Sequence, residues 1–313
     1  MEHRKLIKFG NSSFIVSLPN DWIKKNRLKK GDLMYYTLEN DGIKFYPEFK
    51  EEKELKEANI ELSENMDLFR RELISVYIDG YNVVKIKGRN LETNIKNIRN
   101  ILRNLTSFEI IKQTPELIVV QDFFNIKEVN LKDLIKRMDI ITRSMIEDSI
   151  EGIVTKENKY EILNDKDTDV NRLSFMLFRV IKSSLKDSLL ASKLNMDNLE
   201  LLDNWLLVVN IEKIADEAKR ISRFLRNHSL KVDERKELIK LYNKVKDNYY
   251  NAITAYYNNN KKLAKEVYFS HDILIEECNK YFNKYNKGVL GSVVEKLKGF
   301  VVHTKEISRI VYS

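Results

Sequence analysis

Two carboxylates, Glu212 and Asp216, stand four residues apart in a segment with helical periodicity. This spacing places both side chains on one face of a helix, where like charges repel each other unless a cation lies between them. Hard cations take several oxygen ligands, and Asp167 in the preceding helical segment could supply a third. The pattern predicts a metal site or, alternatively, neutralisation of the pair by basic neighbours. Those neighbours are Lys213, Lys219 and Arg220.

Basic side chains gather near the N-terminus around a short polar segment. Lysine and arginine neutralise phosphates, while asparagine and serine can hydrogen-bond to base edges. An ordinary basic surface is the alternative interpretation. The candidate DNA-binding residues are Arg4, Lys5, Lys8, Asn11, Ser12, Ser13, Lys24 and Lys25.

Motifs for other chemistries are missing from the sequence. Cys278 is the only cysteine and the four histidines are scattered, which excludes a disulfide framework and argues against a zinc site. The chain has no Gly-x-Ser-x-Gly elbow, no P-loop and no His-Glu-x-x-His motif. We therefore expect a protein that is not an enzyme.

Composition indicates a globular protein with a modest positive charge. Among 313 residues, 55 Lys and Arg against 47 Asp and Glu give a net charge of +8, which allows a polyanionic partner without demonstrating one. No apolar run approaches the roughly 18 residues of a membrane helix, and the first residues lack the apolar core of a secretion signal. We expect a cytoplasmic location without membrane insertion.

The N-terminal residues predict a small β-rich unit. Residues 4–18 are typical of one strand kinked at Gly10, and Asn20 stands where the N-cap of a short basic helix belongs. Asp41-Gly42 predicts the tight turn of a hairpin. A unit of about 50 residues buries too little surface to be stable alone, so dimerisation is expected.

The remaining chain divides into a connector, a small α/β domain and a long helical region. Residues 51–66 are charge-rich and predict a solvated connector or a returning strand, and residues 67–126 alternate helical and strand patterns. No proline follows Pro115, and three-four apolar spacing then persists to the end. Five polar breaks and a weak internal repeat predict two three-helix bundles, at 127–230 and 231–313.

The N-terminal segment resembles the swapped-hairpin family of AbrB, SpoVT and MazE. The resemblance is carried by KFGNSSFIVSLPNDWIKKNRLKKGDLMYYTLENDGIKFYPE, which contains a GNS turn, an apolar strand ending in proline, a short basic helix, a KKGD turn and a final hairpin. In that family two chains interlace into one dimeric barrel that binds DNA. The resemblance implies that residues 1–50 form a DNA-binding and dimerisation domain.

The second half resembles the PhoU family of phosphate-uptake regulators, which contains two three-helix bundles. NIEKIADEA is close to the Glu-x-x-x-Asp metal motif of that family, and FRRELISVYIDGYNVVKI resembles the linker domain of archaeal proteins that join the two families. The resemblance implies a divalent or trivalent metal ion in the first bundle, held by Glu212, Asp216 and Asp167. In the second bundle Lys298 and Val302 replace the acidic pair, so no metal is expected there.

These inferences predict a multidomain α+β protein: an N-terminal swapped-hairpin β-barrel dimer, a small α/β middle domain and a pair of PhoU-like three-helix bundles. The expected function is dimeric regulation of phosphate uptake through binding of double-stranded DNA. One alternative is an adaptor that contacts a phosphate transporter or signalling protein and uses residues 1–50 only to dimerise. Another is an antitoxin-like protein whose long tail holds a toxin.

Overall fold

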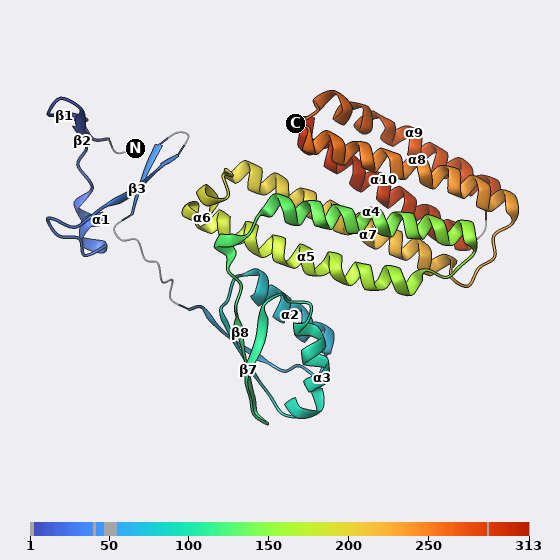
Figure 1. The fold of residues 1–313 in the computed structure, drawn as a ribbon, viewed down its shortest axis with the longest axis horizontal. Coiled ribbons are helices and arrows are strands. Elements are labelled where there is room, and N and C mark those ends of the chain that lie inside the picture. Colours follow the sequence, from blue (N-terminus) through green and yellow to red (C-terminus); the bar gives the residue numbers. More distant parts are fainter. Residues whose placement is uncertain (1–2, 40–41, 47–54, 287, 313) are drawn as a thin grey trace. The chain divides into compact units, whose positions relative to one another are not determined.

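The computed structural model describes residues 3–39, 42–46, 55–286 and 288–312 (Figure 1). The chain divides into two compact units, Met1–Glu54 and Leu55–Ser313. The second unit contains an α/β region followed by a helical region.

The first unit consists of two separate hairpins and one short helix. These are β1 (Ile7–Phe9), β2 (Ser13–Ile15), α1 (Asn20–Lys25), β3 (Tyr35–Glu39) and β4 (Gly42–Tyr46). The prediction of one kinked strand over residues 4–18 is wrong, because Gly10 adopts φ +66° and the chain reverses into an antiparallel pair. Pro19, rather than Asn20, occupies the N-cap of α1. Strands β3 and β4 pair as predicted, although Asp41 of the predicted turn lies outside the described residues.

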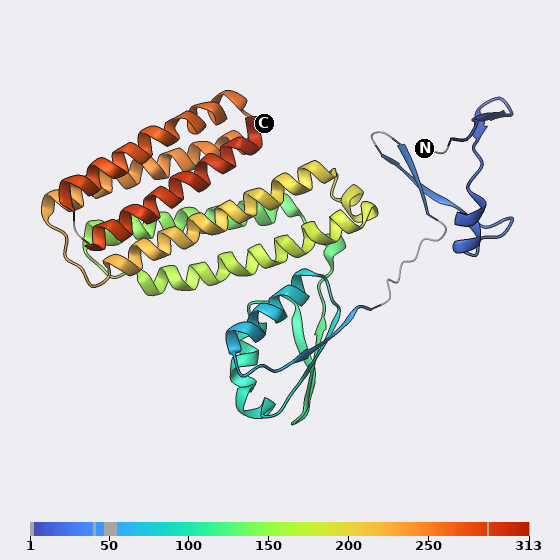
Figure 2. The same cartoon turned by 180° about the vertical axis from the view of Figure 1, so that it is seen from behind.

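The α/β region is a four-stranded sheet with two helices. Its elements are β5 (Glu57–Glu61), α2 (Met66–Ile78), β6 (Val83–Lys87), α3 (Leu91–Leu102), β7 (Phe108–Gln113) and β8 (Leu117–Asp122). The strand order is β5-β6-β8-β7, with β5 and β6 parallel and the other pairs antiparallel. Both helices cover the same face of the sheet (Figures 1 and 2).

One face of this sheet is packed and the other is more polar. In β6, the side chains of Val84 and Ile86 are buried, whereas those of Lys85 and Lys87 point to the opposite face. The segment predicted as a connector contains β5, which binds β6 along its whole length, so only the alternative of a returning strand is correct.

The helical region contains six long helices and one short helix among the described residues, after a short 3-10 turn at Ile126–Glu128. They are α4 (Leu131–Thr155), α5 (Tyr160–Lys186), α6 (Ser188–Lys193), α7 (Asn198–Leu225), α8 (Val232–Tyr257), α9 (Lys261–Tyr285) and α10 (Gly288–Tyr312). The predicted helical character is confirmed, and α6 is an addition to it. Local signals set the helix starts: Asp197 and Glu200 form a reciprocal capping box at the start of α7.

The long helices pack as two groups that share one hydrophobic core. Helices α4, α5 and α7 pack on one another, as do α8, α9 and α10. Helix α7 also packs along α10, and α4 contacts α8. A single cluster of buried apolar side chains therefore runs through all six long helices, including Met138, Leu177, Ile214, Tyr249 and Phe300. The groups are joined by a continuous core rather than by a linker.

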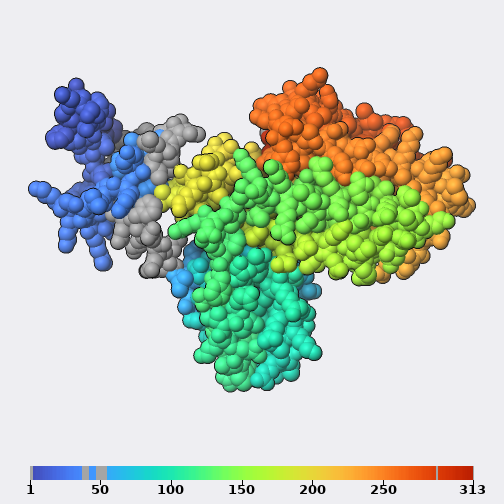
Figure 3. All heavy atoms as spheres, viewed as in Figure 1, coloured from blue at the N-terminus to red at the C-terminus, as the bar shows by residue number. Residues whose placement is uncertain are grey.

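The α/β region is held to α5 by a buried ion pair. Arg179 of α5 pairs with Asp122 at the end of β8, and both side chains are almost fully buried. The Arg179 guanidinium also lies over the ring of Tyr77, 4.8 Å from its centroid, and burial raises the pKa of Tyr77 to about 12. Lys182 pairs with Asp79 nearby. Figure 3 shows the atoms of the two regions meeting directly.

Candidate functional site

The β1–β2 hairpin has one mainly apolar face and one face with mixed character. The register pairs Ile7 with Ile15 and Lys8 with Phe14. Because neighbouring residues of a strand point to opposite faces and opposed residues share a face, Ile7, Phe9 and Ile15 lie together, whereas Lys8 and Phe14 lie on the other side. Phe14 is 61% exposed, so large apolar side chains face solvent on both sides of the hairpin.

The candidate DNA-binding residues are all exposed. Asn11 and Ser12 form the tip of the hairpin, and Ser13 begins β2. Arg4 and Lys5 precede β1, whereas Lys24 and Lys25 occupy the last turn of α1. Among the described residues, none of the four lysines in the set (Lys5, Lys8, Lys24 and Lys25) has a carboxylate partner, so their charges are available to a polyanion.

The first unit lacks an interior of its own. None of its described side chains is buried, and large apolar side chains such as Phe9 (66% exposed) and Leu33 (76% exposed) face solvent. Exposed apolar area of this extent marks an interaction surface. The described side chains of the unit thus leave a large apolar surface open to a partner.

The predicted metal ligands lie in two adjacent helices, but basic side chains occupy the space between them. Lys219 Nζ lies 2.7 Å from Asp167 Oδ2 and 3.1 Å from Asp216 Oδ1. Arg220 binds the other oxygen of Asp216 at 2.7 Å. Glu212 instead pairs with Lys213 at 3.2 Å.

This arrangement does not fit a metal ion. Asp167 Oδ2, the oxygen bound by Lys219, also accepts a hydrogen bond from Asn171 Nδ2 at 3.1 Å, so this oxygen already has two donors. Burial is the largest influence on the Lys219 pKa and lowers it, but the two carboxylates outweigh burial and raise the pKa overall. Within the described part of the chain, no three His, Cys, Asp or Glu side chains are placed to share a metal. Neutralisation of Asp216 by Lys219 and Arg220 is the alternative that this geometry favours.

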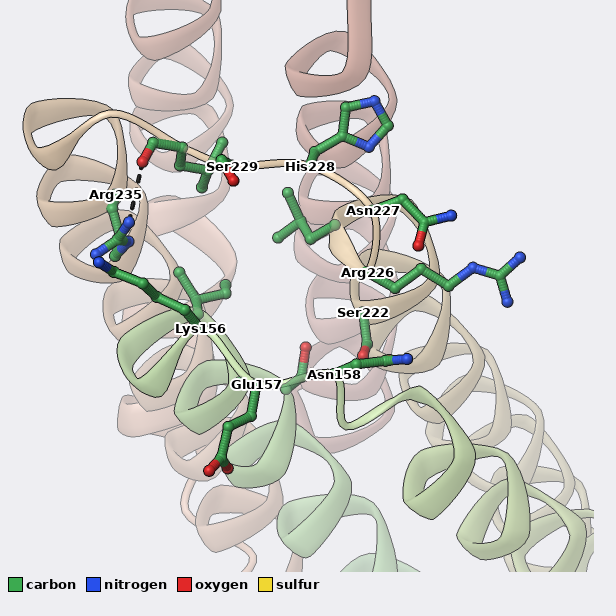
Figure 4. Close-up of a pocket in the computed structure, with 14 residues that line it drawn as sticks. Lys156, Glu157, Asn158, Ser222, Arg226, Asn227, His228, Ser229 and Arg235 are labelled. Atoms are coloured by element: carbon green, nitrogen blue, oxygen red, sulfur yellow. Dashed lines mark hydrogen bonds between the residues drawn. The ribbon is translucent and has the colours of Figure 1, made fainter.

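Sequence reasoning missed a polar pocket at one end of the helical region. The pocket, of about 180 Å³, lies where α4 and α7 end and the loops to α5 and α8 begin. Arg235 donates a hydrogen bond to the carbonyl oxygen of Leu230 at 3.0 Å, and Lys156 points toward the same side of the pocket (Figure 4). Arg226 lines the opposite side. The available signal was Lys156 at one polar break between predicted helices, with Arg226 and Arg235 on either side of another at 229–233.

Two residues with nucleophilic or acid–base chemistry are structural. Cys278 is buried in the helical core, and burial raises its thiol pKa to about 12, so the thiol is protonated at neutral pH. His303 Nδ1 lies 3.0 Å from Asn210 Oδ1, within the α7–α10 contact.

Comparison with known families gives a match within the first unit. Residues 7–50 match the family described as antidote-toxin recognition MazE, bacterial antitoxin. No curated protein shows a significant match to the chain. Among the described residues, no helix has the length and apolar character required to span a membrane. The first unit is thus similar to a MazE-type domain, consistent with a DNA-binding or antitoxin role.

Proposed function

We propose that the chain is a homodimeric transcription regulator that binds double-stranded DNA through residues 1–50 and has no enzymatic activity. The observation that carries this proposal is the β1–β2 hairpin, in which Ile7, Phe9 and Ile15 form an uncovered apolar face and Lys8, which has no carboxylate partner among the described residues, lies on the opposite face beside Phe14. The match of residues 7–50 to the MazE family supports both dimerisation and DNA contact. The apolar face packs on the partner chain and the basic residues contact phosphates.

We assign regulation by phosphate to the helical region. Its resemblance to the PhoU family supports this assignment, as does the pocket at the ends of α4 and α7. Lys156 and Arg235 bring two positive charges to this pocket, and neither has a carboxylate partner among the described residues. Such a pair fits an oxyanion such as inorganic phosphate.

Thermal unfolding of the full chain with added inorganic phosphate tests the pocket. Binding to the folded state raises the melting temperature by mass action, and Lys156→Ala removes that increase. Lys262→Ala, an exposed lysine at the start of α9, is the matched control and retains it. If added phosphate does not raise the melting temperature of the unchanged protein, this assignment is contradicted.

Genome-wide crosslinking and sequencing of bound DNA, with and without phosphate, tests the regulator itself. We expect enrichment at discrete promoters and occupancy that changes with phosphate. Uniform recovery of DNA under both conditions contradicts the proposal.

Charge-removing variants test the basic face in vitro. Replacing Arg4, Lys5 and Lys8 with alanine should weaken binding to every DNA sequence and reduce the slope of log affinity against log salt by about 0.9 for each lost phosphate contact. Asn11→Ala and Ser12→Ala should instead reduce preference for the operator. The matched control replaces three exposed lysines at the start of α9, namely Lys261, Lys262 and Lys265.

A second candidate function follows from the name of the matched family, which describes an antitoxin. In this case the chain binds a protein partner rather than regulating transcription. The partner contacts either the uncovered apolar side chains of the first unit or the long helical region. The adaptor alternative likewise uses the helical region to contact a phosphate transporter or signalling protein. Binding isotherms on DNA that are unchanged in both sets of variants would favour these protein-binding functions.

A further inference from the structure

A basic groove runs along the edge of the sheet in the second unit. It encloses about 670 Å³ between the last turns of α3, strand β7 and Arg172 of α5. Strand β7 pairs only with β8 among the described strands, so half of its backbone groups face away from the sheet. The side chains of a strand alternate between the two faces of the sheet. Because all residues from Glu109 to Gln113 nevertheless line the groove, the groove lies along the edge of β7 rather than on one face of the sheet.

The groove carries four positive charges against one negative charge. The basic residues are Arg99, Arg103, Lys112 and Arg172, and the acidic residue is Glu109. Arg103 and Lys112 have no ion-pair partner among the described residues. Arg99 donates to the side-chain oxygen of Gln113 at 3.3 Å, and Arg172 makes only an exposed contact of 3.6 Å with Asp169. The charge is thus largely uncompensated within the chain.

The floor of the groove is apolar and rigid. Leu102, Leu105 and Phe108 line it and are buried in the sheet core. Ile111, the extra residue at a bulge in β7, is 52% exposed at the rim. A groove of this kind offers backbone hydrogen bonds, a pocket for apolar side chains and positive charge at its walls.

We propose that this groove binds an extended acidic peptide segment of a partner protein, which adds to the sheet alongside β7. Backbone groups of the segment pair with those of β7, an apolar side chain packs on the exposed Ile111, and its carboxylates meet Arg103 and Lys112. The proposal is independent of the DNA-binding surface in the first unit.

Charge and shape distinguish this partner from three others. A second copy of the same edge brings Lys112 and the arginines against themselves, so like charges disfavour pairing between copies. A DNA duplex is too broad to enter a concave groove along one strand. Single-stranded nucleic acid binds by stacking bases on aromatic rings, whereas the only aromatic residue lining the groove, Phe108, is buried.

The test measures binding of fluorescent peptides to the full-length protein. The probe is a short acetylated peptide of alternating glutamate and valine, and its controls are the same peptide with lysine for glutamate and one with alternate backbone amides methylated. We expect the acidic peptide to bind with salt-dependent affinity and both control peptides to bind at least about tenfold more weakly. Hydrogen exchange should slow at Ile110 when the acidic peptide is bound, because its opposite residue Val120 pairs with β6 and the Ile110 amide faces the free edge.

Charge-reversal variants locate the site. Arg103→Glu and Lys112→Glu should each reduce the affinity for the acidic peptide by about tenfold or more. Arg70 is an exposed arginine on α2 outside the groove, so Arg70→Glu should leave this affinity unchanged. Unchanged melting temperatures verify that the exposed substitutions leave the fold intact. Equal binding of the acidic and basic peptides, equal loss in all three variants, or tighter binding of a single-stranded oligonucleotide to the same groove overturns the proposal.

Discussion

The two units of the chain differ in where their stabilising contacts come from. In the second unit, side chains such as Ile214 and Phe300 are completely buried within the chain, whereas no described side chain of the first unit is buried. Hydrophobic burial is the main favourable contribution to folding, and the described part of the first unit gains little of it within one chain. The second unit has a core of its own, whereas under the proposed function the first unit acquires one from its partner chain.

The largest expected effect comes from placing a charge on the uncovered face of the first hairpin. Ile15→Glu should abolish dimerisation and DNA binding, because a carboxylate would be buried against apolar side chains of the partner chain. Helical circular dichroism and thermal unfolding of the second unit should be unchanged. Sedimentation velocity and DNA-binding isotherms at matched protein concentrations measure the two losses.

Val232→Glu is the control for this substitution. Val232 is also a β-branched apolar residue and is 76% exposed at the start of α8 in the second unit. Val232→Glu should therefore have no effect on dimerisation. A fully dimeric Ile15→Glu protein, or a stable folded monomer of residues 1–54, would show that the apolar face is not the dimer interface.

The second-largest effect is expected from a substitution in the interior of the second unit. Arg179→Ala should reduce its free energy of unfolding by about 3–5 kcal/mol, because Asp122 is left as a buried charge without its partner. Burial, despite Arg179 nearby, raises the pKa of Asp122, so loss of the arginine should raise that pKa further. Chemical unfolding followed by helical circular dichroism measures the change.

Arg179→Ala should leave dimerisation through the first unit intact, because the substituted ion pair lies entirely within the second unit. Lys262→Ala, an exposed basic residue of α9, is the surface control and should change stability by less than about 0.5 kcal/mol. Equal stability of Arg179→Ala and the unchanged protein would mean that the ion pair does not anchor the α/β region to α5.

The third expected effect concerns the carboxylates of α5 and α7. Lys219→Ala should cost about 1–3 kcal/mol, because Asp167 and Asp216 lose the ammonium group that lies between them. A chelator should leave the melting temperature of the unchanged protein as it is. Bound divalent or trivalent metal found by elemental analysis, together with destabilisation by chelator, would restore the metal site of Glu212, Asp216 and Asp167.

The sequence predicts the long helices well because their signals are local. Proline-free periodicity and polar breaks such as 258–260 mark helix bodies and ends without reference to the rest of the chain. Strand β5 is harder to recognise, since only Ile60 is buried among charged and polar neighbours and its partner β6 begins 26 residues after its first residue. A strand at a sheet edge carries little periodicity of its own.

The candidate sites are less predictable than the fold because they depend on distant residues. Spacing alone places Glu212 and Asp216 on one helix face, but whether Lys219 or a metal lies between Asp216 and Asp167 depends on the packing of α5 on α7. The basic groove likewise combines α3 and β7 with Arg172 from α5. No pattern within one segment contains that arrangement.

The smallest expected effect is a pH dependence confined to the second unit. His303 Nδ1 donates a hydrogen bond to Asn210 Oδ1, because the Asn210 amide nitrogen already donates to the carbonyl oxygen of Leu206. Burial, aided by Lys213, lowers the pKa of His303, while Glu306 partly opposes this. A histidine pKa below its ordinary value of about 6.5 means that the folded state binds the proton less readily than the unfolded state.

The contribution of His303 is therefore complete above about pH 6.5 and is lost as the pH falls through the lower pKa of the folded state. Denaturant unfolding between about pH 7 and 5.5 should show a stability loss below about 1 kcal/mol that His303→Gln removes. His3→Gln, at an exposed histidine of the first unit, should leave the pH profile of the second unit unchanged. An identical slope in the unchanged protein and His303→Gln would show that His303 does not cause the pH dependence, and the buried carboxylates cannot explain a loss of stability at low pH either. Burial raises the pKa of both Asp139 and Glu217, and a raised carboxyl pKa gives the opposite sign, with stability lost as the pH rises.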